Sequence, residues 1–199
     1  LEPARSPKFD QLRIQKRILE LKFINEITVE NITDICSMLL VIVGGGFAYY
    51  QWKRSVALKR AEFINELTEK IRTDEYIRDV LYLFDYDEYW YSIDFHDSGV
   101  LELKVDKTLS YFSYICYLKN QRLISNKEFR FFEYEVDRIL ENEQVQDYFY
   151  NLYHFCDKKA SITFQYLFEY GEKHKMFDDA FYRKDSYKNN KKYHRYLNF

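Results

Sequence analysis

The pair His96-Asp97 is the first candidate in this sequence for a catalytic or metal-binding site. A His-Asp pair supplies two ligands in metal-dependent phosphohydrolases, but that site needs a further histidine upstream, and none precedes residue 96. Helical ribonucleases of the HEPN type place an arginine a few residues before the catalytic histidine, and no histidine here has one five to seven residues before it. We therefore interpret the pair as polar loop residues and predict no catalytic site.

Two further patterns resemble metal sites. His154 and Cys156 could offer two ligands, but residues two apart on a helix point in different directions, which favours core positions for both. Residues 118–129 resemble the second half of a calcium loop, but Lys119 and Gln121 stand where carboxylates belong. The sequence thus predicts no metal ion and no other cofactor.

One polar aromatic stretch is a candidate recognition surface. It contains Asp85, Asp87, Glu88 and Trp90, with tyrosines around them. Neighbouring carboxylates can hold Mg²⁺ or act as acid and base, although in a loop they are more often simply solvated. Because aromatic rings accompany the charges, we predict that this acidic aromatic loop contacts an unknown protein partner.

The last 29 residues carry eight Lys or Arg against four acids. Basic and aromatic side chains together suit anionic lipid or single-stranded nucleic acid. Between these two, lipid is the simpler partner for a domain tethered to a membrane, so nucleic acid is disfavoured. A solvated, poorly packed tail is favoured over either kind of contact. The candidate contacts are Arg183, Lys184, Lys188, Lys191, Lys192 and Arg195.

Residues 35–52 form an apolar stretch of 18 residues without a charge. At about 1.5 Å per residue, a helix of this length approaches the roughly 30 Å hydrocarbon core of a bilayer. The sequence therefore predicts one transmembrane helix, with a buried core helix as the alternative. A cleaved signal peptide fits poorly, because more than 30 residues precede the stretch.

Aromatic rings followed by cations mark the C-terminal end of this stretch. Such a belt is typical of the cytoplasmic exit of a membrane helix, whereas Glu26, Glu30 and Asp34 lie on the other side. The predicted orientation places the domain that follows the stretch on the cytoplasmic side of the membrane. The expected interface anchors are Tyr49, Tyr50, Trp52, Lys53 and Arg54.

Gly44, Gly45 and Gly46 lie together inside the stretch. Small residues let helix backbones approach closely in lipid, so these glycines are a candidate homo-oligomerisation face. There is no GxxxG spacing, and the alternative is that they merely lower hydrophobicity or allow a bend.

The rest of the composition favours an all-α fold. After the apolar stretch only Gly99 and Gly171 remain, with no proline, so long helices with short connections are expected. Thr73 is a predicted N-cap, Ser125 with Glu128 a capping box, Asn142 another cap, and Gly171 a helix stop. A helix over 100–119 should bury Leu103, Leu109, Phe112 and Cys116. Three unevenly placed cysteines do not form a disulfide framework.

Four segments follow from these signals. We predict an amphipathic N-terminal segment (1–34), a transmembrane helix (35–52), a cytoplasmic helical bundle of about five to six helices (53–171), and a basic aromatic tail (172–199). The transmembrane helix is expected to continue into the first helix of the bundle.

Residues 60–89 (RAEFINELTEKIRTDEYIRDVLYLFDYDEY) and 109–140 (LSYFSYICYLKNQRLISNKEFRFFEYEVDRIL) resemble uncharacterised bacterial proteins with one N-terminal transmembrane helix and a cytoplasmic helical domain of unknown function. The resemblance lies in the general residue pattern and in the order of the predicted helices, and it implies a bacterial origin and this topology. Some proteins of this general architecture act in antiphage defence.

Three functions remain open at this level. The first is a membrane-tethered interaction or sensor module. The second is a membrane-perturbing effector that oligomerises through its transmembrane helix. The third, an enzyme, would require Asp85, Asp87, Glu88 and His96 to cluster in a concave pocket.

Overall fold

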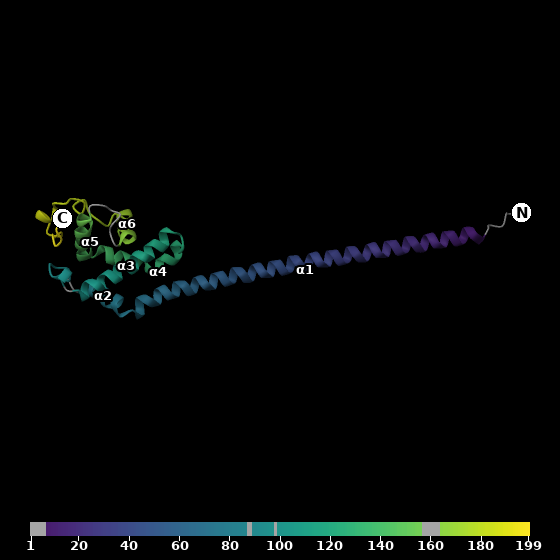
Figure 1. The fold of residues 1–199 in the computed structure, drawn as a ribbon, viewed down its shortest axis with the longest axis horizontal. Coiled ribbons are helices and arrows are strands. Elements are labelled where there is room, and N and C mark those ends of the chain that lie inside the picture. Colours follow the sequence, from purple (N-terminus) through teal and green to yellow (C-terminus); the bar gives the residue numbers. More distant parts are fainter. Residues whose placement is uncertain (1–6, 87–88, 98, 157–163) are drawn as a thin grey trace. The chain divides into compact units, whose positions relative to one another are not determined.

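The structure is a computed structural model that describes residues 7–86, 89–97, 99–156 and 164–199. These residues are all-helical, which confirms the predicted fold class, and they divide into two units, Leu1–Ala61 and Glu62–Phe199 (Figure 1). The elements are α1 (Pro7–Thr73), α2 (Glu75–Tyr86), η1 (Phe95–Asp97), α3 (Val100–Asn120), α4 (Asn126–Glu141), α5 (Glu143–Phe155), α6 (Gln165–Lys173) and η3 (Ser186–Lys188).

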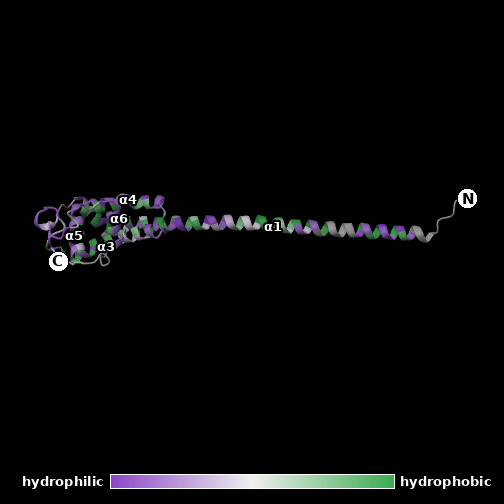
Figure 2. Cartoon of the chain, turned by 90° about the horizontal axis from the view of Figure 1, so that it is seen from above, coloured by the Kyte–Doolittle hydropathy of each residue, from purple (hydrophilic) through white to green (hydrophobic). Residues whose placement is uncertain are grey.

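The first unit is the greater part of α1. This helix contains one segment that is long and apolar enough to cross a membrane, within Asn31–Thr73, and none of its most apolar window is buried (Figure 2). Val41 and Leu40, for example, are 74% and 73% exposed. A core helix of a soluble protein would show the opposite pattern, because its apolar side chains would be buried.

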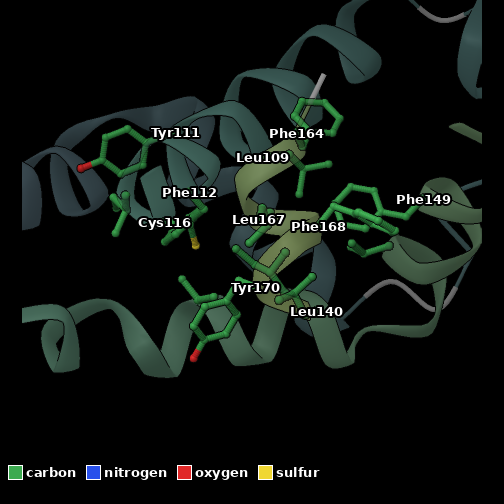
Figure 3. Packing of buried hydrophobic residues seen from close by; sticks show 14 of the residues in the cluster. Leu109, Tyr111, Phe112, Cys116, Leu140, Phe149, Phe164, Leu167, Phe168 and Tyr170 are labelled. Carbon is green, nitrogen blue, oxygen red and sulfur yellow. The ribbon is translucent and has the colours of Figure 1, made fainter. Parts of the chain in front are cut away.

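The second unit has a hydrophobic core of its own, rich in aromatic rings. The buried core residues run from Ile64 to Tyr193. Helix α3 contacts α2, α4 and α6, and Figure 3 shows Leu109 and Phe112 of α3 directed into the same interior as Leu167 of α6. Leu109, Phe112 and Leu167 are all fully buried. The prediction for Leu103 was wrong: it is 62% exposed.

The helix starts in this unit follow local signals. The capping box predicted at Ser125 is present: the Glu128 amide donates to Ser125 Oγ (3.4 Å), and the Ser125 amide donates to Glu128 Oε2 (2.6 Å). Asn142 caps α5 as predicted. At α2 the prediction was off by one residue: Asp74 Oδ1 accepts from the Tyr76 amide (3.0 Å), whereas Thr73 bonds back into α1.

Gly171 does not end its helix, since α6 continues to Lys173. Instead it permits a close approach: a Cβ at this position would lie 2.7 Å from Phe177 Cε2 and 3.4 Å from Leu140 Cδ2. The reason for the glycine is therefore packing against the segment that follows, which the sequence pattern did not reveal.

The C-terminal segment contradicts the prediction of a poorly packed tail. Phe181 and Tyr193 are 0% and 1% exposed and belong to the core. The physical reason lies in α5, which offers buried polar side chains to the irregular backbone of the tail. Tyr150 Oη donates to the Lys184 carbonyl (3.0 Å), and His154 Nε2 lies 2.8 Å from the Phe181 carbonyl.

The cysteines behave as the sequence predicts, because all three are free. Cys116 is buried in the core, and burial raises the pKa of its thiol to about 12. A thiol with such a pKa stays protonated and unreactive at neutral pH.

Candidate functional site

A pocket of about 570 Å³ opens in the second unit where three segments meet. These segments are the end of α2 with the loop after it, the first turns of α5, and residues 191–196 of the tail. The lining residues are Phe84, Asp85, Tyr89, Tyr91, Asn142, Glu143, Gln144, Asp147, Lys191, Lys192, His194 and Tyr196. The pocket therefore unites parts of the acidic aromatic loop and of the basic tail that lie about 100 residues apart in the sequence.

Asn142 joins two of the three walls. Its Oδ1 accepts from the Gln144 and Val145 amides, both at 3.0 Å, which caps α5. Its Nδ2 donates to the Phe84 carbonyl (2.9 Å), which ties the end of α2 to the start of α5. Gln144 Oε1 in turn accepts from the Tyr91 amide (2.6 Å). The loop wall is thus held by side chains of α5.

The third wall is held by Asp147. Its Oδ1 accepts from the His194 amide (2.8 Å), and its Oδ2 lies 2.7 Å from His194 Nδ1. Asp147 is only 4% exposed. Burial raises the pKa of its carboxyl group and the hydrogen bonds from His194 lower it; burial has the larger effect, and the pKa is about 6. The His194 side chain is 52% exposed, so its Nε2 is the nitrogen that can meet a ligand.

A carboxylate-held imidazole is one part of the machinery of acid–base and nucleophilic catalysis. The nucleophile is the other part, and the pocket lining contains no serine, threonine or cysteine. Within the ranges that the structure describes, no three His, Cys, Asp or Glu side chains come together as a metal site either.

The pocket has charges of both signs. Asp85 lies beside Arg138 of α4, with Oδ2 and Nη1 3.0 Å apart, and Glu143 is exposed at the start of α5. Lys191 and Lys192 come from the opposite wall, where Lys192 Nζ is 3.8 Å from Asp178 Oδ2. A ligand that fits these walls would carry both a cation and an anion, or polar groups of both kinds.

Trp90 corrects the prediction for the acidic aromatic loop. It is 4% exposed and packs against Phe84 and Phe95, with ring centroids 5.1 and 5.5 Å away. A large aromatic side chain beside the core gains more from burial than from exposure. Trp90 therefore positions the loop from inside, and Asp85 is the predicted residue that faces the pocket. Asp87 and Glu88 lie outside the described residues.

His96 takes part in a different network. Its Nδ1 lies 2.9 Å from Glu102 Oε1, and its Nε2 lies 3.3 Å from Tyr91 Oη. Burial raises the pKa of Tyr91, so its phenol keeps its proton. The pocket lining includes Asp85 and not His96, so these two members of the candidate catalytic set are not brought together there.

The six cations of the tail also divide into two groups. Lys191 and Lys192 line the pocket. Arg183, Lys184, Lys188 and Arg195 are exposed and outside its lining. Lys184, Lys188 and Arg195 of this second group lie beside the rings of Tyr187 and Phe199.

The predicted membrane residues all lie in α1 and are exposed. Among the described residues, a Cβ at Gly44, Gly45 or Gly46 would meet nothing within 4 Å. The rings of Tyr49 and Trp52 lie 6.0 Å apart on the helix surface.

Sequence reasoning missed most of the pocket. Asp147 and His194 were not candidates, although polar residues did stand out in the otherwise aromatic sequence of α5. Gln146, Asp147, Asn151 and His154 are all buried there. Since buried polar groups are hydrogen-bonded, such a helix indicates that some other segment must supply partners.

Comparisons of this chain with protein-family models, with curated proteins and with solved structures find no match.

Proposed function

We propose that this protein is a membrane-tethered interaction and sensor module that acts at the cytoplasmic face of a bacterial inner membrane. Residues 35–52 of α1 serve as its single transmembrane segment. The second unit is the cytoplasmic domain, and its pocket binds a protein partner.

The tether is supported by the exposed apolar face of α1 and by its flanks. Exposed side chains in this window include Met38 at 66% and Val43 at 68%, which in water would be unfavourable by roughly 25 cal/mol per Å² of apolar surface. Trp52, Lys53 and Arg54 follow directly, and this order favours a cytoplasmic C-terminal side.

The pocket is the single observation that carries the binding role. A partner segment with both charges, such as an extended peptide, would place its cation near Asp85 and Glu143 and its anion near Lys191 and the Nε2 of His194. Tyr196 adds an aromatic surface to the lining, and its ring stacks on His194 at 5.4 Å between centroids.

Site-specific photo-cross-linking in living cells tests this role. A photoreactive residue at Glu143 should form a discrete adduct, and the same probe at Arg130, an exposed α4 residue outside the pocket lining, serves as the control. Lys191→Glu should abolish the adduct, because it reverses the charge of one wall. Adducts that are identical at both probe positions, or that ignore Lys191→Glu, would count against a pocket-bound partner.

A further inference from the structure

The C-terminal tail builds a compact cluster of cations around two aromatic rings. Tyr187 and Phe199 meet edge to face, with centroids 6.2 Å apart and planes at 84°. Arg195 lies 5.5 Å from the first ring and 5.3 Å from the second, Lys184 lies 6.0 Å from Phe199, and Lys188 lies 5.8 Å from Tyr187. We call these five residues the cation–ring cluster.

The positive charge of this cluster is not neutralised by acids. Lys184, Lys188 and Arg195 are exposed, and none of them forms an ion pair with a described acid. Cation–π contacts hold the charged groups over the rings without removing their charge, so their outer sides remain open to an anion.

The cluster is also fixed in place by the core. The Tyr150 hydroxyl contacts the Arg183 and Lys184 carbonyls at 3.3 and 3.0 Å, and the Tyr150 ring packs 5.8 Å from Phe199. Tyr150 is fully buried. A preorganised set of cations loses less conformational entropy on binding than cations on a disordered tail would lose.

We propose that the cation–ring cluster binds anionic lipid headgroups and docks the domain on the bilayer that α1 spans. The inference rests on the proposed membrane anchoring. The cytoplasmic surface of such a membrane is negatively charged and attracts exposed Lys and Arg side chains. Anchoring in the same molecule keeps the cluster at high effective concentration near that surface, so weak headgroup contacts suffice.

Single-stranded nucleic acid fits the cluster less well. Base stacking needs open ring faces, whereas Arg195 and the two lysines lie over the rings of Tyr187 and Phe199. The shape of the cluster therefore favours phosphate groups at a surface over splayed bases.

Energy transfer in reconstituted full-length protein tests the proposal. Trp52→Phe leaves Trp90, in the domain, as the sole tryptophan donor. Vesicles of phosphatidylcholine, alone or with phosphatidylglycerol, carry the same density of dansyl-labelled lipid. We expect stronger transfer in the anionic vesicles and loss of the difference at high salt, because salt screens exposed charges.

Replacing Lys184, Lys188 and Arg195 with Ala should remove this difference. Each cation contributes about fivefold near an anionic surface, so the docking equilibrium should fall about 100-fold. The matched control replaces three other exposed cations, Lys127, Arg130 and Lys173, and should keep the difference at the same net charge. Circular dichroism of both triple variants checks that the fold is retained.

Three results would overturn the proposal. Equal transfer in neutral and anionic vesicles, with protein that resists carbonate extraction, would refute docking while leaving the anchoring intact. Extraction of the protein by carbonate would refute the anchoring and this inference with it. Loss of lipid-dependent transfer on adding a single-stranded oligonucleotide at physiological salt would assign the cluster to nucleic acid.

Discussion

The apolar stretch of α1 and helix α5 depart from the pattern of an ordinary surface helix in opposite ways. Residues 35–52 leave their apolar side chains exposed, whereas α5 buries polar ones, among them Asp147 and Asn151. Each departure implies that the helix needs contacts from outside itself. For the apolar stretch the proposed partner is lipid, which lies outside the chain. For α5 the partner is the chain's own tail, whose backbone supplies the hydrogen bonds.

The largest effect should come from adding charge to the apolar stretch. Leu40→Arg combined with Val43→Arg places two cations near its middle, each costing about 2.5 to 3.5 kcal/mol for insertion. We expect the protein to leave the carbonate-resistant membrane fraction. Ser55→Arg, beyond the stretch, is the control and should stay membrane-bound. Unchanged retention of the double variant would show that this stretch is not the anchor.

The next effect should come from Asn151, which is fully buried. Its Nδ2 donates to the His194 carbonyl (2.9 Å), and its Oδ1 accepts from the Tyr196 amide (2.8 Å). Asn151→Leu should lower the free energy of unfolding by about 3 kcal/mol, because it leaves buried backbone groups without partners. Urea unfolding measures the loss, and faster tryptic cleavage after Arg195 would show release of the tail. Asn189→Ala, at an exposed position of the tail, should change neither measurement.

Glycines offer a direct comparison of the two regions. Gly171→Ala should destabilise the domain by about 2 kcal/mol, because the new Cβ would clash with Phe177. Gly45→Ala meets open space and should leave the melting temperature unchanged or slightly raised, since alanine is the better helix former. Thermal unfolding of both variants in detergent checks this. Equal effects at the two positions would contradict the packing role of Gly171.

The smallest effect should be a pH dependence of the pocket wall. The folded pKa of Asp147 is about 6, above the ordinary value of 3.8, so its contribution to stability is fully present below 3.8 and is lost as the pH rises through 6. The change should be on the order of 2 kcal/mol. Urea unfolding between pH 4 and 8 measures it, and Asp147→Asn should flatten the profile in this window. A wild-type profile without this slope would show that Asp147 remains ionised throughout.

The sequence by itself determined the local features of this protein. Three such features are the charge-free stretch, the capping box at Ser125 and the cap at Asn142. Each depends on residues that are close together in the sequence, so it can be recognised without knowledge of the fold. The all-helical class could be predicted from the scarcity of glycine and proline, because the composition is known without the fold.

Only the tertiary structure decided the pocket, the burial of Trp90 and the packing of the tail. Asp147 and His194 are 47 residues apart, and Asn142 and Phe84 are 58 apart. Contacts between residues so far apart in the sequence depend on how α5 is placed in the core. The residues next to them in the sequence do not indicate these contacts. The sequence predicted a solvated basic tail because the tail binds to buried polar side chains of α5. These side chains and the tail meet only in the folded chain, so the sequence does not show that they interact.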